Sequence, residues 1–286
     1  MGLTRLVAAG AIRLSENANC HLVPWGDAPE CGFPAPSAEI FNFQPYGTLS
    51  IAGQEFNFTK PVVLAIIGSI LLIVFFVAIF RKPKLVPGRM QSVGEYGYTF
   101  IRDGVAREVI GKEGDKYVPF LFSLFFFVWM LNIWGIIPFA QFPVSSRIAW
   151  PAALALIIWP MYMYLGMRHQ GPVKFFKDMM FPPGLPWPIY IILAPIELIS
   201  TVIIRPVTLT IRLFANMFAG HLLLTIFAIA TFYLISPSII GLLGSGASFA
   251  VSVVLTGFEA FIQALQAFIF TLLAAVYIST SLHAEH

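Results

Sequence analysis

Five stretches of the chain are apolar for long enough to cross a lipid bilayer as helices. They are residues 61–80, 117–137, 148–167, 187–230 and 247–282. The first three have about the 20 residues that one helical crossing needs. The last two are longer, and a helix spanning 187–230 would extend to about 60 Å, twice the thickness of the hydrocarbon core. We therefore expect the last two helices to tilt or kink, and the first of them contains Pro188, Pro195 and Pro206.

The segments outside these stretches are more polar. Residues 1–60 mix proline, glycine and acidic residues, which predicts a mostly irregular tail with a short amphipathic helix at 3–15. Residues 91–112 alternate apolar and charged positions at helical spacing, which is typical of an amphipathic helix on the membrane surface, although a solvated connector remains an alternative. Residues 236–246, with the sequence SPSIIGLLGSG, predict the turn between the two long helices.

Composition places the chain among all-α polytopic membrane proteins. It has 286 residues, of which 58% are hydrophobic and 11% are charged, and its mean hydropathy is +0.82. Soluble domains of this length do not have such a composition. Neither a His/Cys cluster nor a glycine-rich phosphate loop is present in the sequence, so we expect no metal and no cofactor. The net charge of +3 gives no argument for a nucleic-acid partner.

The basic residues predict the orientation in the membrane. They cluster at 81–89 and at 168–177, and the positive-inside rule assigns both clusters to the cytoplasm. Residues 1–60 then form an extracytoplasmic tail, residues 61–286 form the membrane domain, and five crossings bring the C-terminus to the cytoplasm. An outside location would also permit a disulfide between Cys20 and Cys31.

The helix expected at 187–230 carries a polar stripe. At about 100° per residue, its polar residues fall within roughly 120° of one another. They are Glu197, Thr201, Arg205, Thr208, Arg212 and Asn216. Ala215 and Ala219 share the face of Arg212, and small residues let another helix approach closely. The stripe predicts a contact surface for a partner, with one guanidinium in its middle. The alternative is a packing helix whose arginines reach the lipid headgroups, which suits Arg205 better than Arg212.

The last helix has a stripe of its own, centred on Glu259. Hydroxyl and amide side chains align with this carboxylate at helical spacing. They are Ser248, Ser252, Thr256, Gln263, Gln266 and Tyr277. A glutamate aligned with such groups inside a membrane helix predicts a hydrated path for protons. Asn132, in the stretch 117–137, is a lone polar residue that either bonds a neighbouring helix or lines this path.

These residues predict ion movement. Arg212 keeps its charge at any workable pH, so it cannot relay protons but can attract a carboxylate on a moving partner. Glu259 and His221 can exchange protons. A proton-coupled secondary transporter is the alternative, and it would have two similar halves or broken helices around a substrate site, but we find no internal repeat. An enzyme would need clustered carboxylates, an activated nucleophile or metal ligands, and none is visible.

The sequence RPVTLTIRLFANMFAGH, which contains Arg212, resembles the signature of subunit a of F-type ATP synthase. The resemblance extends from about residue 90 to the C-terminus. It implies that Arg212 is the essential arginine, Asn216 its neighbour, and Gln266 the glutamine of the LQAFIF motif. It also implies that His221 and Glu259 occupy two positions that hold one histidine and one acidic residue.

The resemblance is weaker for two parts of the expected proton path. Glu197 and Ser200 would be the inner-exit residues, but their spacing to Pro206 is one residue longer than we expect for many members. Gly135 stands where some members have an acidic residue, which leaves Asn132 to serve that part of the outer route. Thr208 and Gln263 complete the set of expected path residues.

The resemblance also implies a function. Subunit a is a non-catalytic part of the membrane sector and forms two proton half-channels beside the rotating ring of c subunits. A proton enters from outside, neutralises a ring carboxylate, travels with the ring and leaves through the inner half-channel. The expected partners are the c ring, the b-subunit peripheral stalk and the lipid bilayer, and the expected location is the cell membrane.

Overall fold

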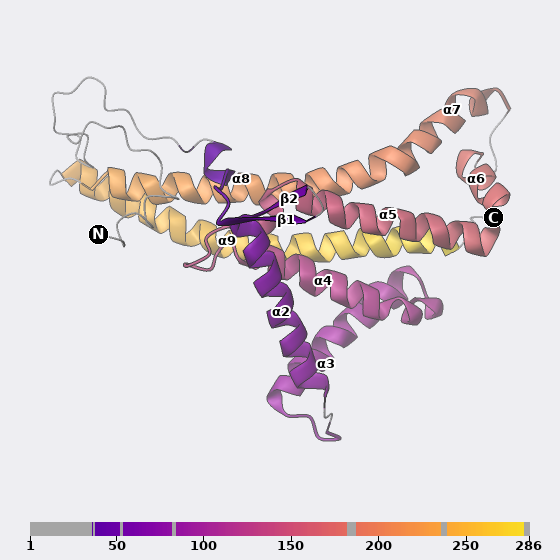
Figure 1. The fold of residues 1–286 in the computed structure, drawn as a ribbon, viewed down its shortest axis with the longest axis horizontal. Helices are drawn as coiled ribbons and strands as arrows, with labels where there is room; N and C mark the ends of the chain where they lie inside the picture. The colour runs from indigo at the N-terminus through magenta and orange to yellow at the C-terminus, as the bar shows by residue number, and fades with distance from the viewer. Residues whose placement is uncertain are drawn as a thin grey trace.

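Two long helices run side by side along the length of the molecule (Figure 1). The structure, a computed structural model, describes residues 36, 38–51, 54–81, 84–181, 187–235 and 239–282. The long helices are α8 (Arg205–Tyr233) and α9 (Ile239–Leu282). α7 (Trp187–Ile199) continues into α8 through a π-helical segment, η5 (Ser200–Ile204). The expectation of two helices longer than an upright crossing is confirmed.

The length of these helices determines how they can sit in a membrane. α9 has 44 residues, which makes it about 66 Å long at 1.5 Å per residue. The hydrocarbon core is only about 30 Å thick, so the helix must tilt strongly. α7 also leaves the line of α8 (Figure 1). Pro195 and the π-helical segment account for this change of direction, since both interrupt the regular ladder of helical hydrogen bonds.

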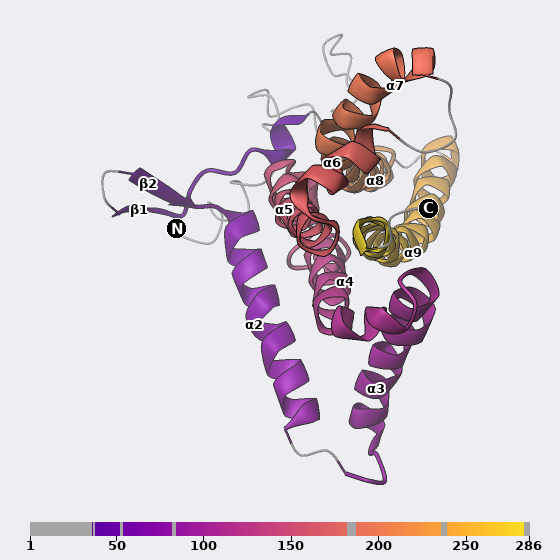
Figure 2. The same cartoon turned by 90° about the vertical axis from the view of Figure 1, so that its right-hand side faces the viewer.

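Three shorter helices complete the bundle, and two of them pack against the long pair. They are α2 (Lys60–Phe80), α4 (Val118–Ile133) and α5 (Ala149–Gln170). α4 contacts both α2 and α9, while α5 contacts both α8 and α9. Among the described residues, four helices are long and apolar enough to cross a membrane, and α4 is a shorter apolar helix. α2 crosses the direction of α8 and α9 at a steep angle (Figures 1 and 2).

The core of the bundle lies where α4 meets α9. α4 buries a face of apolar residues that recur at helical spacing. They are Val118, Leu121, Val128 and Leu131, each fully buried. The residues that α9 contributes to this core are Ala267, Ala274, Ala275 and Ile278, which are also fully buried. Small side chains on α9 let the two helices approach closely, which increases the van der Waals contact that holds helices together in lipid.

The segment between α2 and α4 is helical but interrupted. α3 (Arg89–Ile101) continues into a π-helical segment, η2 (Arg102–Arg107), and a short 3-10 helix, η3 (Lys112–Lys116), follows. Gly111 separates the two parts with a φ of +86°, a conformation that glycine adopts at little cost. The single helix expected at 91–112 is therefore wrong at its C-terminal end. Its location on the membrane surface stays a prediction.

A pair of hydrogen bonds closes this loop. Arg107 donates from Nε and Nη2 to the two carboxylate oxygens of Asp115, at 2.8 Å each. This contact lowers the pKa of the Asp115 carboxyl below its ordinary value. The bidentate pair joins η3 to η2 just before α4 begins.

The structure corrects the expectation for residues 1–60. β1 (Gly47–Ile51) pairs with β2 (Gln54–Phe58) in an antiparallel hairpin, preceded by a 3-10 turn, η1 (Ala38–Phe41). The prediction of irregular structure is therefore wrong for these segments. Alternation of polar and apolar residues at 55–59 is the signal that was available. The helix expected at 3–15, together with Cys20 and Cys31, lies outside the described residues.

The turn expected at 236–246 is also wrong for most of its length, because α9 begins at Ile239. Glycine and serine disfavour a helix only weakly, and packing overrides that preference. The hydroxyl of Ser245 donates to the carbonyl of Thr231 on α8 at 2.8 Å. A Cβ on Gly244 would lie 3.3 Å from Leu234. The small residues thus let the start of α9 pack against the end of α8.

Gly114 provides a test of how η3 is packed. A Cβ at Gly114 would overlap the backbone carbonyl of Ala106, and backbone cannot move aside as a side chain can. We expect Gly114→Ala to destabilise the fold by about 1–3 kcal/mol. Thermal unfolding of the purified complex in detergent should show a lower midpoint temperature. Gly104→Ala is the control, since its Cβ would meet only Phe100 at 4.0 Å. Equal midpoints for the two variants would contradict the packing described here.

Candidate functional site

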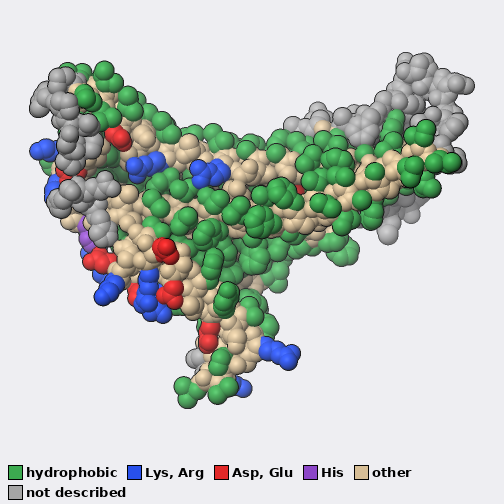
Figure 3. Space-filling model, turned by 180° about the vertical axis from the view of Figure 1, so that it is seen from behind, with side chains coloured by type: hydrophobic (Ala, Val, Ile, Leu, Met, Phe, Trp, Pro, Cys, Tyr) green, Lys and Arg blue, Asp and Glu red, His purple; other side chains and the backbone are tan. Residues whose placement is uncertain are grey.

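The exposed face of α8 carries the central arginine. Arg212, Ala215, Asn216 and Ala219 are all exposed, as the helical spacing predicted. Large apolar side chains flank them on the same helix, including Val207, Ile211 and Leu223. Among the described residues, no carboxylate lies within ion-pair distance of Arg212. Figure 3 shows that charged side chains gather toward one end of the molecule and on its lower projection, while most of the visible surface of the long helices is apolar.

The polar stripe of α8 is not continuous, which corrects the sequence-based prediction. Thr201 is buried, with 4% of its surface exposed. The guanidinium of Arg205 lies over the ring of Tyr277 on α9, at 5.4 Å from its centroid. The π-helical segment η5 accounts for Thr201, because a π-turn contains more residues than an α-turn and rotates what precedes it. Arg205 follows η5 on α8, so its half-buried position goes with its contact to Tyr277 instead. Thr208 remains exposed, and its hydroxyl donates to carbonyls of its own helix.

A buried polar cluster joins α9 to α4. Glu259 and Gln263 are buried on α9, and Gln263 Nε2 donates to Glu259 Oε1 at 3.3 Å. Asn132 of α4 donates from Nδ2 to the backbone carbonyl of Gln263 at 3.4 Å. Asn132 is fully buried. Its position is compatible with both alternatives from the sequence, a hydrogen bond to a neighbouring helix and a place lining the proton path. Gln266 is buried one turn further along α9.

The cluster has polar atoms that remain unpaired within the described chain. Glu259 Oε2, Gln263 Oε1 and Asn132 Oδ1 are buried and have no hydrogen-bond partner. Leaving buried polar atoms without partners costs free energy, and proteins commonly satisfy them with ordered water. The cluster is therefore suited to hold water molecules between side chains that can donate and accept protons.

Two glycines make room for the cluster. A Cβ on Gly220 of α8 would lie 3.4 Å from the carboxyl carbon of Glu259. A Cβ on Gly135 would lie 3.0 Å from Gln263 Nε2. The Glu259 carboxylate thus packs directly on the backbone of α8, one residue before His221. In this way the structure brings the two titratable residues to neighbouring positions on the α8–α9 contact.

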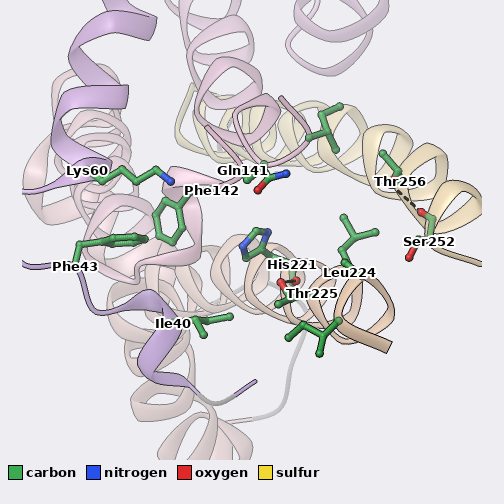
Figure 4. Close-up of a pocket in the computed structure, with 14 residues that line it drawn as sticks. Ile40, Phe43, Lys60, Gln141, Phe142, His221, Leu224, Thr225, Ser252 and Thr256 are labelled. Carbon is green, nitrogen blue, oxygen red and sulfur yellow. Dashed lines mark hydrogen bonds between the residues drawn. The ribbon is translucent and has the colours of Figure 1, made fainter. Parts of the chain in front are cut away.

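His221 lies at a cavity of about 390 Å³ (Figure 4). Its ring contacts the rings of Phe41 and Phe142, with centroids 5.7 and 6.1 Å away. Its Nδ1 is buried and has no hydrogen-bond partner among the described residues. Polar groups from four parts of the chain line the same cavity, and they are Lys60, Gln141, Thr225, Ser252 and Thr256.

Sequence reasoning missed Lys60, Phe43 and Gln141 as neighbours of this site. Lys60 begins α2, and its amino group lies over the ring of Phe43, 5.5 Å from the centroid. Phe43 follows η1, and both reach the cavity because the segment before α2 folds back over the bundle. No pattern in the sequence indicated this, since residues 1–60 were expected to form a mostly irregular tail outside the membrane.

A second cleft opens on the other side of the α8–α9 contact. It has a volume of about 360 Å³ and is lined by Asn216, Gly220 and Glu259, among others. Leu224 lines both this cleft and the cavity at His221. Asn216 stands about one helical turn from Arg212. Glu259 therefore lies between the cavity that holds His221 and the exposed face that carries Arg212.

Glu197 and Ser200 are not part of this cluster. Both are half-buried and lie at the other end of the long helix, before or within the π-helical segment. Glu197 is separated from Asn216 by 19 positions, or about 28 Å along a helix. The expected path residues thus fall into two groups, one near Glu259 and one near Glu197, with Arg212 between them along α8.

The chain matches a known protein family over most of its length. A family model described as ATP synthase A chain matches residues 62–279. The chain is similar to ATP synthase subunit a of Streptomyces lividans, with 48% identity over 96% of this chain and 94% of the relative. It is 43% identical to ATP synthase subunit a of Frankia alni, over 89% of this chain and 88% of the relative. The subunit a of Hyphomonas neptunium is 43% identical over 83% of this chain and 92% of the relative.

The cavity at His221 can be tested independently of any function. In a background without Cys20 and Cys31, a cysteine at Ser252 should react quickly with a small water-soluble thiol reagent, because the position lines the cavity. A cysteine at Thr271, which is fully buried on the same helix, should react at least about tenfold more slowly. Similar rates at the two positions in membrane vesicles would mean that the cavity does not hold water.

Proposed function

The chain belongs to the ATP synthase A chain family. We propose that it forms two proton half-channels beside a ring of c subunits, and that Arg212 separates them. It is a multi-pass membrane protein of the ATP synthase membrane sector and takes part in proton translocation together with other subunits of that complex. The further assignments that follow are proposals, and each rests on particular side chains.

The isolation of Arg212 is the observation that carries the proposal. A charge within an apolar helix is costly, so it needs a partner or water. Within the described chain, Arg212 is exposed among apolar side chains and has no carboxylate beside it. A carboxylate on a neighbouring c subunit would supply the missing partner. At about 4 Å and an effective dielectric of about 20, such a pair is worth about 4 kcal/mol.

The outer half-channel would run from the cavity at His221 to Glu259. The unpaired buried atoms of His221, Glu259, Gln263 and Asn132 support it, because they are suited to a chain of water molecules. Asn216 lines the cleft between Glu259 and the exposed face, so a proton could pass from Glu259 to the ring there. Gln266, buried on the same helix as Glu259, extends the polar lining.

The inner half-channel would pass Thr208, Ser200 and Glu197. These residues lie along the long helix on the other side of Arg212 from Asn216. The positive charge of Arg212 would stand between the two half-channels and repel a proton moving directly from one to the other. A proton would then have to travel with the ring, which couples its passage to rotation. In this role the subunit conducts protons and is itself non-catalytic.

Orientation and partners follow from the same assignment. The basic segments at 81–89 and 168–177 support a cytoplasmic position for both, an N-terminus outside the cell membrane and a C-terminus in the cytoplasm. The exposed face of α8 and α9 would contact the c ring. The exposed apolar side chains of α2, such as Ile70 and Ile73, would face lipid or the peripheral stalk of b subunits.

Replacement of Arg212 tests the proposal. Arg212→Ala should abolish ATP-driven proton pumping in membrane vesicles, because the fixed charge is lost. Arg212→Lys should also be badly impaired, since lysine keeps the charge but lacks the planar fork. Both variants should assemble, because the change removes side-chain atoms from an exposed face.

Passive proton leak gives a second readout and a control. With the soluble catalytic part removed, leak through the Arg212→Ala membrane sector should persist or rise, because the barrier between the half-channels is gone. Arg168→Ala, which changes an exposed arginine bonded to Tyr164, should pump normally. Coupled pumping at the unmutated rate in Arg212→Ala would overturn the proposed function.

An exchange of the two titratable residues tests the shared outer path. We expect the double variant His221→Glu, Glu259→His to pump faster than either His221→Ala or Glu259→Ala, because both acid–base groups remain on the same contact between α8 and α9. Pumping in inverted vesicles, normalised to the assembled subunit, measures this. An exchanged protein as slow as the worse alanine variant would argue against a common path.

A further inference from the structure

The π-helical segment η5 leaves one backbone carbonyl without a helical donor. The N–H of Arg205 donates to the carbonyl of Ser200, five residues earlier, instead of to that of Thr201. The next residue that could donate to Thr201 in a π-turn is Pro206, which has no N–H. The carbonyl of Thr201 is therefore deprived of both donors that a helix would offer it.

Tyr162 of α5 supplies the missing donor. Its hydroxyl donates to the Thr201 carbonyl at 2.8 Å. The contact is buried, since 2% of the surface of Tyr162 and 4% of that of Thr201 are exposed. A buried carbonyl without a donor is costly, so this hydroxyl favours the π-turn over arrangements in which Thr201 is bonded differently.

The π-turn also fixes the direction in which the inner path residues face. Each residue of an α-helix rotates the chain by about 100°, and a π-turn accommodates one residue more than an α-turn. An unbroken α-helix would put Glu197 about 60° to one side of Arg212. With one residue taken up by the π-turn, Glu197 lies about 40° to the other side. The spacing from Glu197 to Pro206 is one residue longer than we expect for many members of the family, and the π-turn accommodates that residue.

We propose that the hydroxyl of Tyr162 is a positioning group that holds the π-turn and thereby sets the angle between Glu197 and Arg212. Tyr162 does not handle the proton. It acts through the backbone of Thr201 on the residues that precede the turn. The inference rests on the proposed function in one respect, which is that Glu197 and Ser200 form the inner exit.

Tyr162→Phe isolates the hydroxyl. Phenylalanine keeps the ring, whose centroid lies 5.5 Å from that of Tyr277, so packing between α5 and α9 should survive. We expect coupled proton pumping to fall about fivefold or more, because the buried carbonyl of Thr201 loses its donor. The amount of assembled subunit should not change. Tyr164→Phe is the matched control, since Tyr164 is an exposed tyrosine on the same helix and should pump at the unmutated rate.

A labelling experiment measures the turn directly and needs no turnover. In a background without Cys20 and Cys31, single cysteines are placed at each of positions 196–199 and treated with a small water-soluble thiol reagent. If Tyr162→Phe releases the π-turn, the most reactive position should move by one residue, which corresponds to about 100° of rotation. Cysteines at positions 213–216, beyond the turn, should keep their reactivity pattern in both proteins.

Pro206→Ala provides a rescue. Alanine restores an N–H at position 206, which can donate to a carbonyl of the turn. In the Pro206→Ala background, Tyr162→Phe should then change pumping and labelling by less than about twofold, well below its effect in the original chain. A role of Tyr162 in packing alone would give the same loss in both backgrounds.

The outcomes separate the inference from the proposed function. A shifted labelling pattern with rescue by Pro206→Ala supports the positioning role. An unchanged pattern in Tyr162→Phe overturns it, whatever happens to pumping. A shifted labelling pattern with unimpaired pumping supports the stabilisation of the π-turn by Tyr162. The same result refutes the assignment of Glu197 and Ser200 to the inner exit. Loss of the pattern at 213–216 would show a general disruption and would overturn the local role.

Discussion

The contact between α8 and α9 is the constraint on which the rest of the structure depends. Both helices are too long to stand upright in a bilayer, and both carry polar side chains that lipid cannot satisfy. Apart from those on the exposed face of α8, such side chains have to be satisfied between the two helices or against α4 and α5. Gly220 allows this, because the Glu259 carboxylate occupies the space in front of its backbone. A Cβ at that position would already be in van der Waals contact with the carboxylate, 3.4 Å from its carbon.

Much of this architecture could be predicted from the sequence, because continuous apolar runs have few alternatives in lipid. The positions of α2, α5, α8 and α9 follow from such runs. The exposed face with Arg212 and Asn216 and the buried face with Glu259 and Gln263 follow from helical spacing alone. Spacing works there because each stretch is regular helix, so that about 100° per residue holds throughout.

The features that could not be predicted depend on contacts distant in sequence. Extrapolating the stripe from Arg212 back to Thr201 fails, because the intervening π-turn is stabilised by Tyr162, 39 positions away. Pro206 and the additional residue before it were the local signals, but neither identifies the donor. Lys60 joins the cavity at His221 only because the segment before α2 folds back. The helical start of α9 is held by packing against α8, which outweighs its glycines.

The two polar regions of the long helix are satisfied in different ways, and this difference bears on the isolation of Arg212. Near Glu259, the side chain of Asn132 on α4 donates to the backbone of α9, Gln263 donates to Glu259, and buried polar atoms remain free for water. Near Thr201, a tyrosine satisfies a backbone carbonyl, and Arg205 is covered by the ring of Tyr277. Arg212 lies between the two regions, and the described chain gives it neither a carboxylate nor a covering ring. Exposed apolar side chains flank it on the same helix. A charge on such a face is costly in lipid, and under the proposed function a polar or anionic group of another subunit would offset that cost.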